Sequence, residues 1–422
     1  MKKKYVLMAA FIAAFFSLLG SCSPLENVPE DPEDNGENHY TPISLTTKQT
    51  GFVQAGNAFA GRFIDRIDEN AGKNNQDEWI VSPLSLQIAL GMLLNGAQGE
   101  TASEICRTLG YKEGETAEVN AWCKLMLEQL PKLDKKTELS LANAIFYNKK
   151  ITLKGPYRDI VESDYKATLE ALDFSQTKAA AGVINAWCDK QTKGLIPHVI
   201  DEVSPSMLAY LVNALYFKGK WANPFAKSAT DDETFTDERG KKCKVKMMKL
   251  DGKEFNYVEN DLWQTIRLPY GNGAYSMTVL LPKKGHTVRE ITAALAKDPN
   301  VVPYGKAKAD LWLPAFETKY NIGLNNILKD MGMQRAFDPR FADFLAMSDY
   351  DSFVSFVQQD AVIKVNEEGS EAAAVTIIGM EATAYIPQQP QKVVFHADHP
   401  FLYLITESST GTILFAGKYA GK

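Results

Sequence analysis

The chain has 422 residues, of which 45% are hydrophobic and 23% are charged, and its formal net charge is -6. This composition is typical of a folded protein with one large or two medium domains. An acidic chain with scattered lysines argues against nucleic acid as a partner. The five histidines are dispersed, and the sequence has no HExxH, nucleophile-elbow or glycine-rich phosphate motif. It therefore indicates neither an enzyme nor a bound metal or cofactor.

Residues 1–21 predict a lipoprotein signal peptide. Lysines at residues 2–4 precede an apolar run over residues 5–19, and Leu-Gly-Ser-Cys follows at residues 19–22. In such signals the cysteine is lipidated and becomes the mature N-terminus. An ordinary secretory signal or an uncleaved anchor are the alternatives, although the run is short for a spanning helix. We expect lipidation at Cys22 and membrane attachment through that lipid.

Residues 22–46 predict a tether. They are acidic and rich in proline, a composition that favours an unfolded linker. Loss of the signal peptide removes three lysines and no acids, which takes the formal charge from -6 to -9. The acidic stretch resembles surface-export signals, and Ser23 is not the aspartate associated with inner-membrane retention. We expect a secreted lipoprotein at the outer membrane or cell surface, with the side of the membrane left open.

Four further cysteines, Cys106, Cys123, Cys188 and Cys243, are widely spaced and form no CxxC pair. This spacing indicates neither a zinc site nor a disulfide framework. We expect free, buried thiols.

Helical periodicity dominates the first third of the folded region. Apolar residues recur at helical spacing over residues 51–70. Ser82 can cap a helix that begins at Pro83, because proline fits the first helical position. Two further helices are predicted over residues 100–109 and 117–130.

Strand signals dominate the remainder. Residues 139–147 alternate only partly and are strongly apolar, which predicts a strand buried on both faces. The other predicted strands lie at 211–221, within 234–281, at 309–316 and, as a pair, within 401–415; helices are predicted at 184–192 and 324–331. Because strands and helices do not alternate regularly, we predict one α+β domain over residues 47–422 with large mixed or antiparallel sheets.

The stretch from Val365 to Thr376 combines a flexible glycine with a strand-like alternation. Gly369 frees the backbone, and the β-branched residues that end the stretch favour extended structure. Laid into a sheet with Glu371 facing water, the segment would place four small, uncharged side chains on the opposite face. These side chains are Ser370, Ala372, Ala374 and Thr376. Such a face could enter a sheet without burying an unpaired charge.

In order and spacing, these segments resemble the serpin family from about residue 47 to the C-terminus. The matching stretches are VSPLS at 81–85, LVNALYFKGKW at 211–221, LPY at 268–270, the hinge at 367–376 and HPF at 399–401. The resemblance implies three β-sheets, eight or nine helices and an exposed reactive-centre loop, here at about residues 367–391. It also implies a suicide-substrate mechanism, in which a protease attacks the loop and the freed loop inserts into the main sheet as an extra strand.

The resemblance also assigns roles to individual residues. The residues that match the hinge are Glu367, Gly369, Ser370, Ala372, Ala373, Ala374 and Thr376. The scissile bond is expected near Thr383 and Ala384, within a window of 380–385. The region where the sheet parts is matched by Ser82, Ser85 and Asn213, and the residue beneath the first insertion is matched by Trp221. Two positions depart from the family pattern. Gln359, followed by Asp360, replaces a frequent histidine, and Ala315 replaces a lysine or arginine that pairs with the hinge glutamate.

The loop composition narrows the expected target protease. No lysine or arginine lies between Gly369 and Gln391, so trypsin-like proteases have no site there. Thr383 and its alanine neighbours suit an elastase-like or subtilisin-like serine protease; a papain-like cysteine protease stays open, and Tyr385 or Met380 would admit a chymotrypsin-like enzyme. The alternative is a non-inhibitory serpin that acts as a binding or structural surface protein. We expect a monomer in either case.

Overall fold

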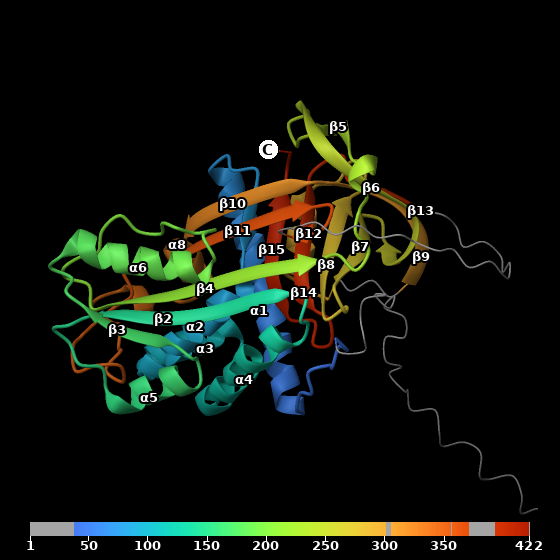
Figure 1. Ribbon diagram of the computed structural model, residues 1–422. Coiled ribbons are helices and arrows are strands. Elements are labelled where there is room, and N and C mark those ends of the chain that lie inside the picture. Colours follow the sequence, from blue (N-terminus) through green and yellow to red (C-terminus); the bar gives the residue numbers. More distant parts are fainter. Residues whose placement is uncertain (1–37, 301–304, 356, 371–392, 422) are drawn as a thin grey trace, which may run out of the picture.

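The computed structural model describes residues 38–300, 305–355, 357–370 and 393–421 (Figure 1). The signal peptide, Cys22 and most of the predicted tether lie outside the described residues. So do the later hinge residues Ala372, Ala373, Ala374 and Thr376, and the predicted scissile pair Thr383 and Ala384. No helix among the described residues is long and apolar enough to cross a membrane.

The described residues form eight α-helices. They are α1 (Thr47–Lys73), α2 (Pro83–Gly96), α3 (Gly99–Leu109), α4 (Thr116–Gln129), α5 (Gly155–Ser163), α6 (Thr177–Gln191), α7 (Val288–Leu295) and α8 (Asn325–Asp330). The predicted cap of α2 is confirmed, since the Ser82 side chain accepts a hydrogen bond from the Ser85 amide and Pro83 occupies the first turn. The sequence did not predict α5 and α7.

A six-stranded sheet runs in the order β10-β11-β12-β4-β2-β3. Its strands are β2 (Glu138–Asn148), β3 (Thr168–Leu172), β4 (Ala209–Lys220), β10 (Phe316–Gly323), β11 (Gln358–Asn366) and β12 (Gly369–Ser370). Because β12 pairs antiparallel with both β4 and β11, those two long strands run parallel to each other.

A nine-stranded sheet runs in the order β1-β15-β14-β8-β7-β6-β9-β13, with β5 also paired to β6. Its strands are β1 (Trp79–Val81), β5 (Asp231–Thr236), β6 (Lys242–Glu259), β7 (Trp263–Tyr270), β8 (Tyr275–Pro282), β9 (Gly305–Pro314), β13 (Val393–His396), β14 (Phe401–Glu407) and β15 (Ile413–Tyr419). The ladder between β6 and β9 shifts register between Leu250 and Lys253. The described strands thus form two continuous sheets, and the longest ladder of the nine-stranded sheet is interrupted at this irregularity.

Side chains alternate between the two faces of β2 and β4, so each strand contributes to two hydrophobic clusters. Phe146 and Tyr210 face a small cluster under α6, whereas Ile145 and Phe217 belong to the main core. Figure 1 shows α6 lying beside β4, and α6 contacts both β4 and β2. On the other side, α2 contacts both β4 and β15, so the main core lies between the two sheets.

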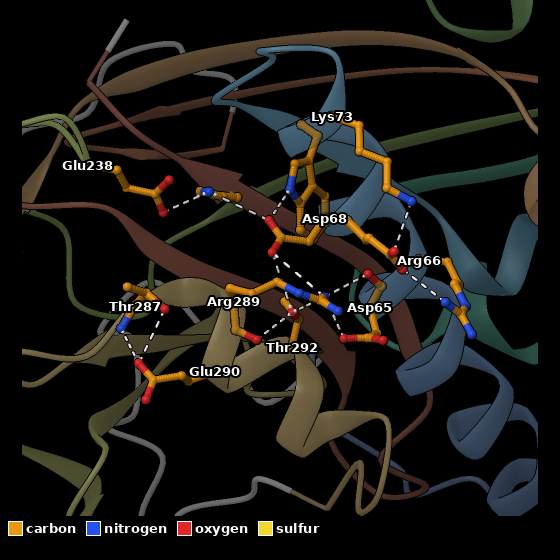
Figure 2. Close-up of polar contacts among 12 residues, drawn as sticks. Asp65, Arg66, Asp68, Lys73, Glu238, Thr287, Arg289, Glu290 and Thr292 are labelled. Carbon is orange, nitrogen blue, oxygen red and sulfur yellow. Dashed lines mark hydrogen bonds and ion pairs between the residues drawn. The ribbon is translucent and has the colours of Figure 1, made fainter.

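A buried polar network around Asp68 fixes α1 to the nine-stranded sheet and to α7 (Figure 2). The Asp68 carboxylate accepts a hydrogen bond from Trp79 Nε1 at 3.1 Å and lies 3.5 Å from Lys418 Nζ. Thr292 Oγ1 of α7 lies 3.4 Å from its second oxygen. Asp68 and Lys418 are both buried, and Lys418 Nζ also lies 2.8 Å from Glu238 Oε1, so Lys418 is shared between two carboxylates.

Residues 38–46 are part of the folded body, rather than of the tether that the sequence predicts. Tyr40 donates its hydroxyl hydrogen bond to the buried Glu407 carboxylate at 2.7 Å, and the Ile43 amide donates to Ser409 Oγ at 3.0 Å. Asn38 Nδ2 donates to Asp134 at 2.9 Å. The composition of residues 38–46 could not predict these contacts, because the partner residues lie far away in the sequence.

The four cysteines of the described chain are free, as predicted. Cys106, Cys123 and Cys188 are buried, and burial raises the pKa of each thiol. Cys243 is partly exposed.

Candidate functional site

The two-residue strand β12 is seated at one end of the space between β4 and β11. Gly369 pairs with Lys220 of β4 and Asn366 of β11, and Ser370 pairs with Gly219 and Val365. Among the described residues, β12 is the strand that joins β4 to β11. The first predicted inserted residue, Ser370, therefore lies inside the main sheet.

Backbone geometry requires glycine at 369. Its φ is 153°, and a Cβ atom there would lie 2.1 Å from the carbonyl oxygen of Gly219. Any side chain would push β12 away from β4.

The Ser370 side chain points into the protein, where it is 1% exposed and its Oγ lies 2.8 Å from the Tyr270 hydroxyl. Burial raises the pKa of Tyr270 well above its usual range, so this phenol stays neutral. This buried, uncharged contact with the Tyr270 hydroxyl is called the seat of Ser370.

Trp221 contacts both Tyr270 and the backbone of the hinge. Its indole stacks on the Tyr270 ring with centroids 4.4 Å apart and planes 13° apart, and its Nε1 donates to the Asn366 carbonyl at 2.9 Å. Its backbone amide donates to the Glu368 carbonyl at 2.9 Å. The structure thus brings Trp221 to the hinge. Tyr270 was not predicted to have a role there, although LPY at 268–270 is one of the matching stretches.

The two hinge glutamates contact the segment that follows β4. Thr230 Oγ1 donates to Glu367 Oε1 at 2.8 Å, and the Phe225 amide donates to the Glu367 carbonyl at 2.8 Å. Glu368 Oε1 lies 2.7 Å from Lys227 Nζ. Nothing in the local sequence around these residues signals that they meet.

Ser82, Ser85 and Asn213 meet near the opposite end of the same space. Ser82 Oγ donates to the Leu414 carbonyl at 2.7 Å, and Ser85 Oγ donates to Asn213 Oδ1. Asn213 Nδ2 in turn donates to Asn143 Oδ1 of β2 at 2.5 Å. The sequence missed Asn143, although an asparagine inside a doubly buried strand is itself a signal.

Gln359 binds the start of α2 with both ends of its amide. Its Oε1 accepts from the Ser82 amide at 2.9 Å, and its Nε2 donates to the Ser82 carbonyl at 3.0 Å. The residue that departs from the family pattern therefore ties β11 to α2 through two neutral hydrogen bonds.

A cavity of about 150 Å³ lies beside these residues. It is lined by the far ends of β4 and β11 together with α2 and α6, through side chains that include Ala89, Leu93, Ile184, Cys188, Val212 and Asn213. One end of the space between β4 and β11 is thus occupied by β12, while the other end holds a largely apolar cavity.

No group of three or more His, Cys, Asp or Glu side chains that could hold a metal ion occurs within the described part of the chain. The chemistry of the site is hydrogen bonding along strand edges. The main sheet thus holds a two-residue strand at one end of the space between β4 and β11 and a cavity at the other end.

Comparisons with known proteins identify the family of the chain. The family model Serpin (serine protease inhibitor) matches residues 54–421. An uncharacterised serpin-like protein of Thermococcus kodakarensis is 34% identical over 99% of this chain and 98% of its own length. Antithrombin-III of Ovis aries is 31% identical over 92% of this chain and 85% of its own length. The native crystal structure of the thermophilic serpin tengpin superposes with a TM-score of 0.77 at 27% identity, covering 91% of this chain and 97% of that one.

The chain belongs to the serpin family. The predicted serpin fold is confirmed. Serpins are generally protease inhibitors rather than catalytic enzymes, and they generally act on target proteases.

Proposed function

We propose that this serpin inhibits a serine endopeptidase as a suicide substrate, by inserting its cleaved loop between β4 and β11. The observation that carries the proposal is β12, in which Gly369 and Ser370 already pair with both strands. A strand that is begun but not completed can be lengthened by adding further ladder hydrogen bonds, and each of these contributes roughly 1 kcal/mol net.

The register of β12 predicts where the inserted residues would lie. Continued without a bulge, it would bring Thr376 beside Asn213 of β4 and Gln359 of β11. The predicted inward face continues from Ser370 through Ala372 and Ala374 to Thr376, and it carries no charge. Small side chains suit entry beside the cavity at that end, where a charged one would cost several kcal/mol.

The proposed reaction forms an ester intermediate, from which either insertion of the loop or hydrolysis of the ester can follow. The protease nucleophile attacks the carbonyl carbon of Thr383, the bond to Ala384 breaks, and the amine of Ala384 leaves with a proton. Insertion must then outrun hydrolysis of the ester by water. A native state that is held kinetically, rather than at its free-energy minimum, supplies the driving force.

The proposed target is an elastase-like or subtilisin-like protease, on the loop composition alone. The test is incubation with elastase, subtilisin, trypsin and papain, followed by denaturing gel electrophoresis. We expect a detergent-stable complex with elastase or subtilisin and none with trypsin. The mass of the released C-terminal peptide locates the bond, and cleavage outside residues 380–385 would contradict the assignment.

The competing proposal is a non-inhibitory serpin. It deserves a direct test because thyroxine-binding globulin, solved as its complex with thyroxine, superposes with a TM-score of 0.76 at 27% identity. A non-inhibitory chain would be cleaved by every protease that reaches the loop and would form no stable complex.

We also propose that the mature protein is a monomer attached through lipid at Cys22 to the outer membrane or cell surface, with the reactive loop free to meet a protease. Palmitate labelling of the wild-type chain and of Cys22→Ala tests this. Labelling that survives the substitution would contradict it.

A further inference from the structure

The two acidic residues of the hinge differ in how they are held. Glu367 accepts a neutral hydrogen bond from Thr230, whereas Glu368 makes an ion pair with Lys227. The Glu368 side chain is only 14% exposed. A carboxylate at that depth needs a charged partner or several hydrogen bonds.

Lys227 is the cation that contacts Glu368 among the described residues. It belongs to a short 3-10 turn, Lys227–Ala229, which lies between β4 and β5. The second carboxylate oxygen, Oε2, is buried and has no hydrogen-bond partner within the described chain. The position that resembles the usual partner of the hinge glutamate carries Ala315, whose backbone amide donates to the Lys246 carbonyl.

Glu368 also connects directly to β12. Its amide and that of Gly369 both donate to Asn366 Oδ1, at 3.0 and 3.2 Å, and its carbonyl accepts from the Trp221 amide. Glu368 therefore lies within the hydrogen-bonded turn that presents Gly369 and Ser370 to β4.

We propose that Lys227 is a positioning residue of the hinge: its ammonium group holds Glu368 and so keeps Gly369 and Ser370 seated between β4 and β11. The consequence for inhibition rests on the proposed function, because a seated β12 is the starting point from which insertion would proceed. The seating itself does not depend on any protease.

The test compares Lys227→Met with Lys246→Met. Both lysines are similarly exposed, at 64% and 65%, and both pair with a carboxylate. The partner of Lys246 is Asp232, which is 61% exposed and makes no contact with Glu368, so this variant is the matched control. Circular dichroism verifies that each variant is folded.

Hydrogen exchange of the peptide that spans residues 365–370 measures the seating directly. We expect exchange in Lys227→Met to be roughly fivefold faster than in the wild type, the scale of a partly buried ion pair, and unchanged in Lys246→Met. Lys227→Arg should keep the protection of residues 365–370 at the wild-type level or raise it, because a guanidinium fork can reach both oxygens of Glu368. Wild-type exchange in Lys227→Met would overturn the proposal, as would equal acceleration in both methionine variants.

A double-substitution cycle separates the pair from general loosening. Glu368→Gln keeps the shape of the side chain and removes its charge, and in that background Lys227→Met should have little further effect. Additive effects would overturn the proposal.

The ratio of trapped to cleaved serpin supplies the functional readout. We expect Lys227→Met to double the cleaved fraction and Lys246→Met to leave it unchanged. If the wild type traps no protease at all, the proposed function fails, and the exchange experiment still decides the role of Lys227.

Discussion

The two sheets of this protein differ in completeness. In the nine-stranded sheet β14 pairs along its length with β8 and β15, and all eight residues of β8 are buried. In the six-stranded sheet β4 and β11 are joined by the two residues of β12, and a cavity lies beyond them. One sheet is paired continuously, whereas the other has only two residues between β4 and β11, and the proposed function places the inserted strand there.

We expect the two sheets to have different roles. The nine-stranded sheet, with α1 fixed to it by Asp68, supplies a rigid base. In the proposed function, the six-stranded sheet gains ladder hydrogen bonds and apolar burial after the loop is cut. Substitutions in the first region should lower stability without changing the fate of a protease, whereas substitutions in the second should change that fate.

The largest effect is expected from Ser370→Arg. It would force a guanidinium into the seat against Tyr270, at a cost of several kcal/mol. We expect the variant to be cleaved as a substrate and to trap no protease in a denaturing gel. Ala374→Arg should behave alike.

Glu371→Arg is the matched control, because alternation turns residue 371 to the solvent face when the segment is extended. It should trap protease at the wild-type yield. Normal trapping by Ser370→Arg, or loss of trapping by Glu371→Arg, would show that the inserted face is misassigned.

Asp68→Ala tests the rigid base. It leaves Glu238, 2.8 Å away, as the carboxylate partner of the buried Lys418 and removes the acceptor of Trp79 Nε1, and we expect a loss of about 1–3 kcal/mol in the free energy of unfolding. Denaturant unfolding measures this loss. The ratio of trapped to cleaved serpin should stay the same at a temperature where the variant is folded, and a changed ratio would contradict the division between the sheets.

Ala89→Leu tests the six-stranded sheet from its cavity. The larger side chain would fill apolar space between α2 and the far ends of β4 and β11, and we expect a gain of about 1 kcal/mol in native stability. Insertion should slow, so more serpin should be cleaved than trapped. Ala121→Leu, at an exposed position of α4, is the control and should change neither quantity.

Glu233→Gln should have the smallest effect. The Lys249 ammonium, and after it His396, lower the pKa of Glu233, which links β5 to β6 and to the strand β13 that follows the loop. Because the folded-state pKa lies below the usual glutamate value, its contribution is present above that value and is lost as the pH falls through the lowered pKa. We expect less than about 1 kcal/mol at pH 7.

The pH dependence of this variant provides the check. Its difference from the wild type in thermal midpoint should shrink as the pH falls below the range of an ordinary glutamate. A difference that grows on acidification would reverse the sign of the assigned interaction.

Local patterns predicted much of the fold. The 3.6-residue periodicity found α1, and Ser82 with Pro83 found the start of α2. The missed helix α7 carried a readable signal, since Thr287 and Glu290 form a capping box. The missed α5 carried a weaker signal: Pro156 lies in its first turn, but only Tyr157 and Val161 of its nine residues are buried.

The site was less predictable where its contacts join distant loops. Ser370 could be placed on an inward face because alternation is local. The contacts of Glu367 with Thr230 and of Glu368 with Lys227 have no such pattern, since the first joins residues 137 positions apart. The pairing of β6 with β9 was likewise not predicted, because the register between distant strands is set by tertiary packing.

The central claim is that the loop, once cut, becomes a strand between β4 and β11. Hydrogen exchange of β4 and β11, measured in the intact protein and after cleavage within residues 380–385, tests it most directly. We predict stronger protection of both strands after cleavage, together with a higher thermal midpoint. Unchanged protection and an unchanged midpoint in the cleaved protein would contradict the claim.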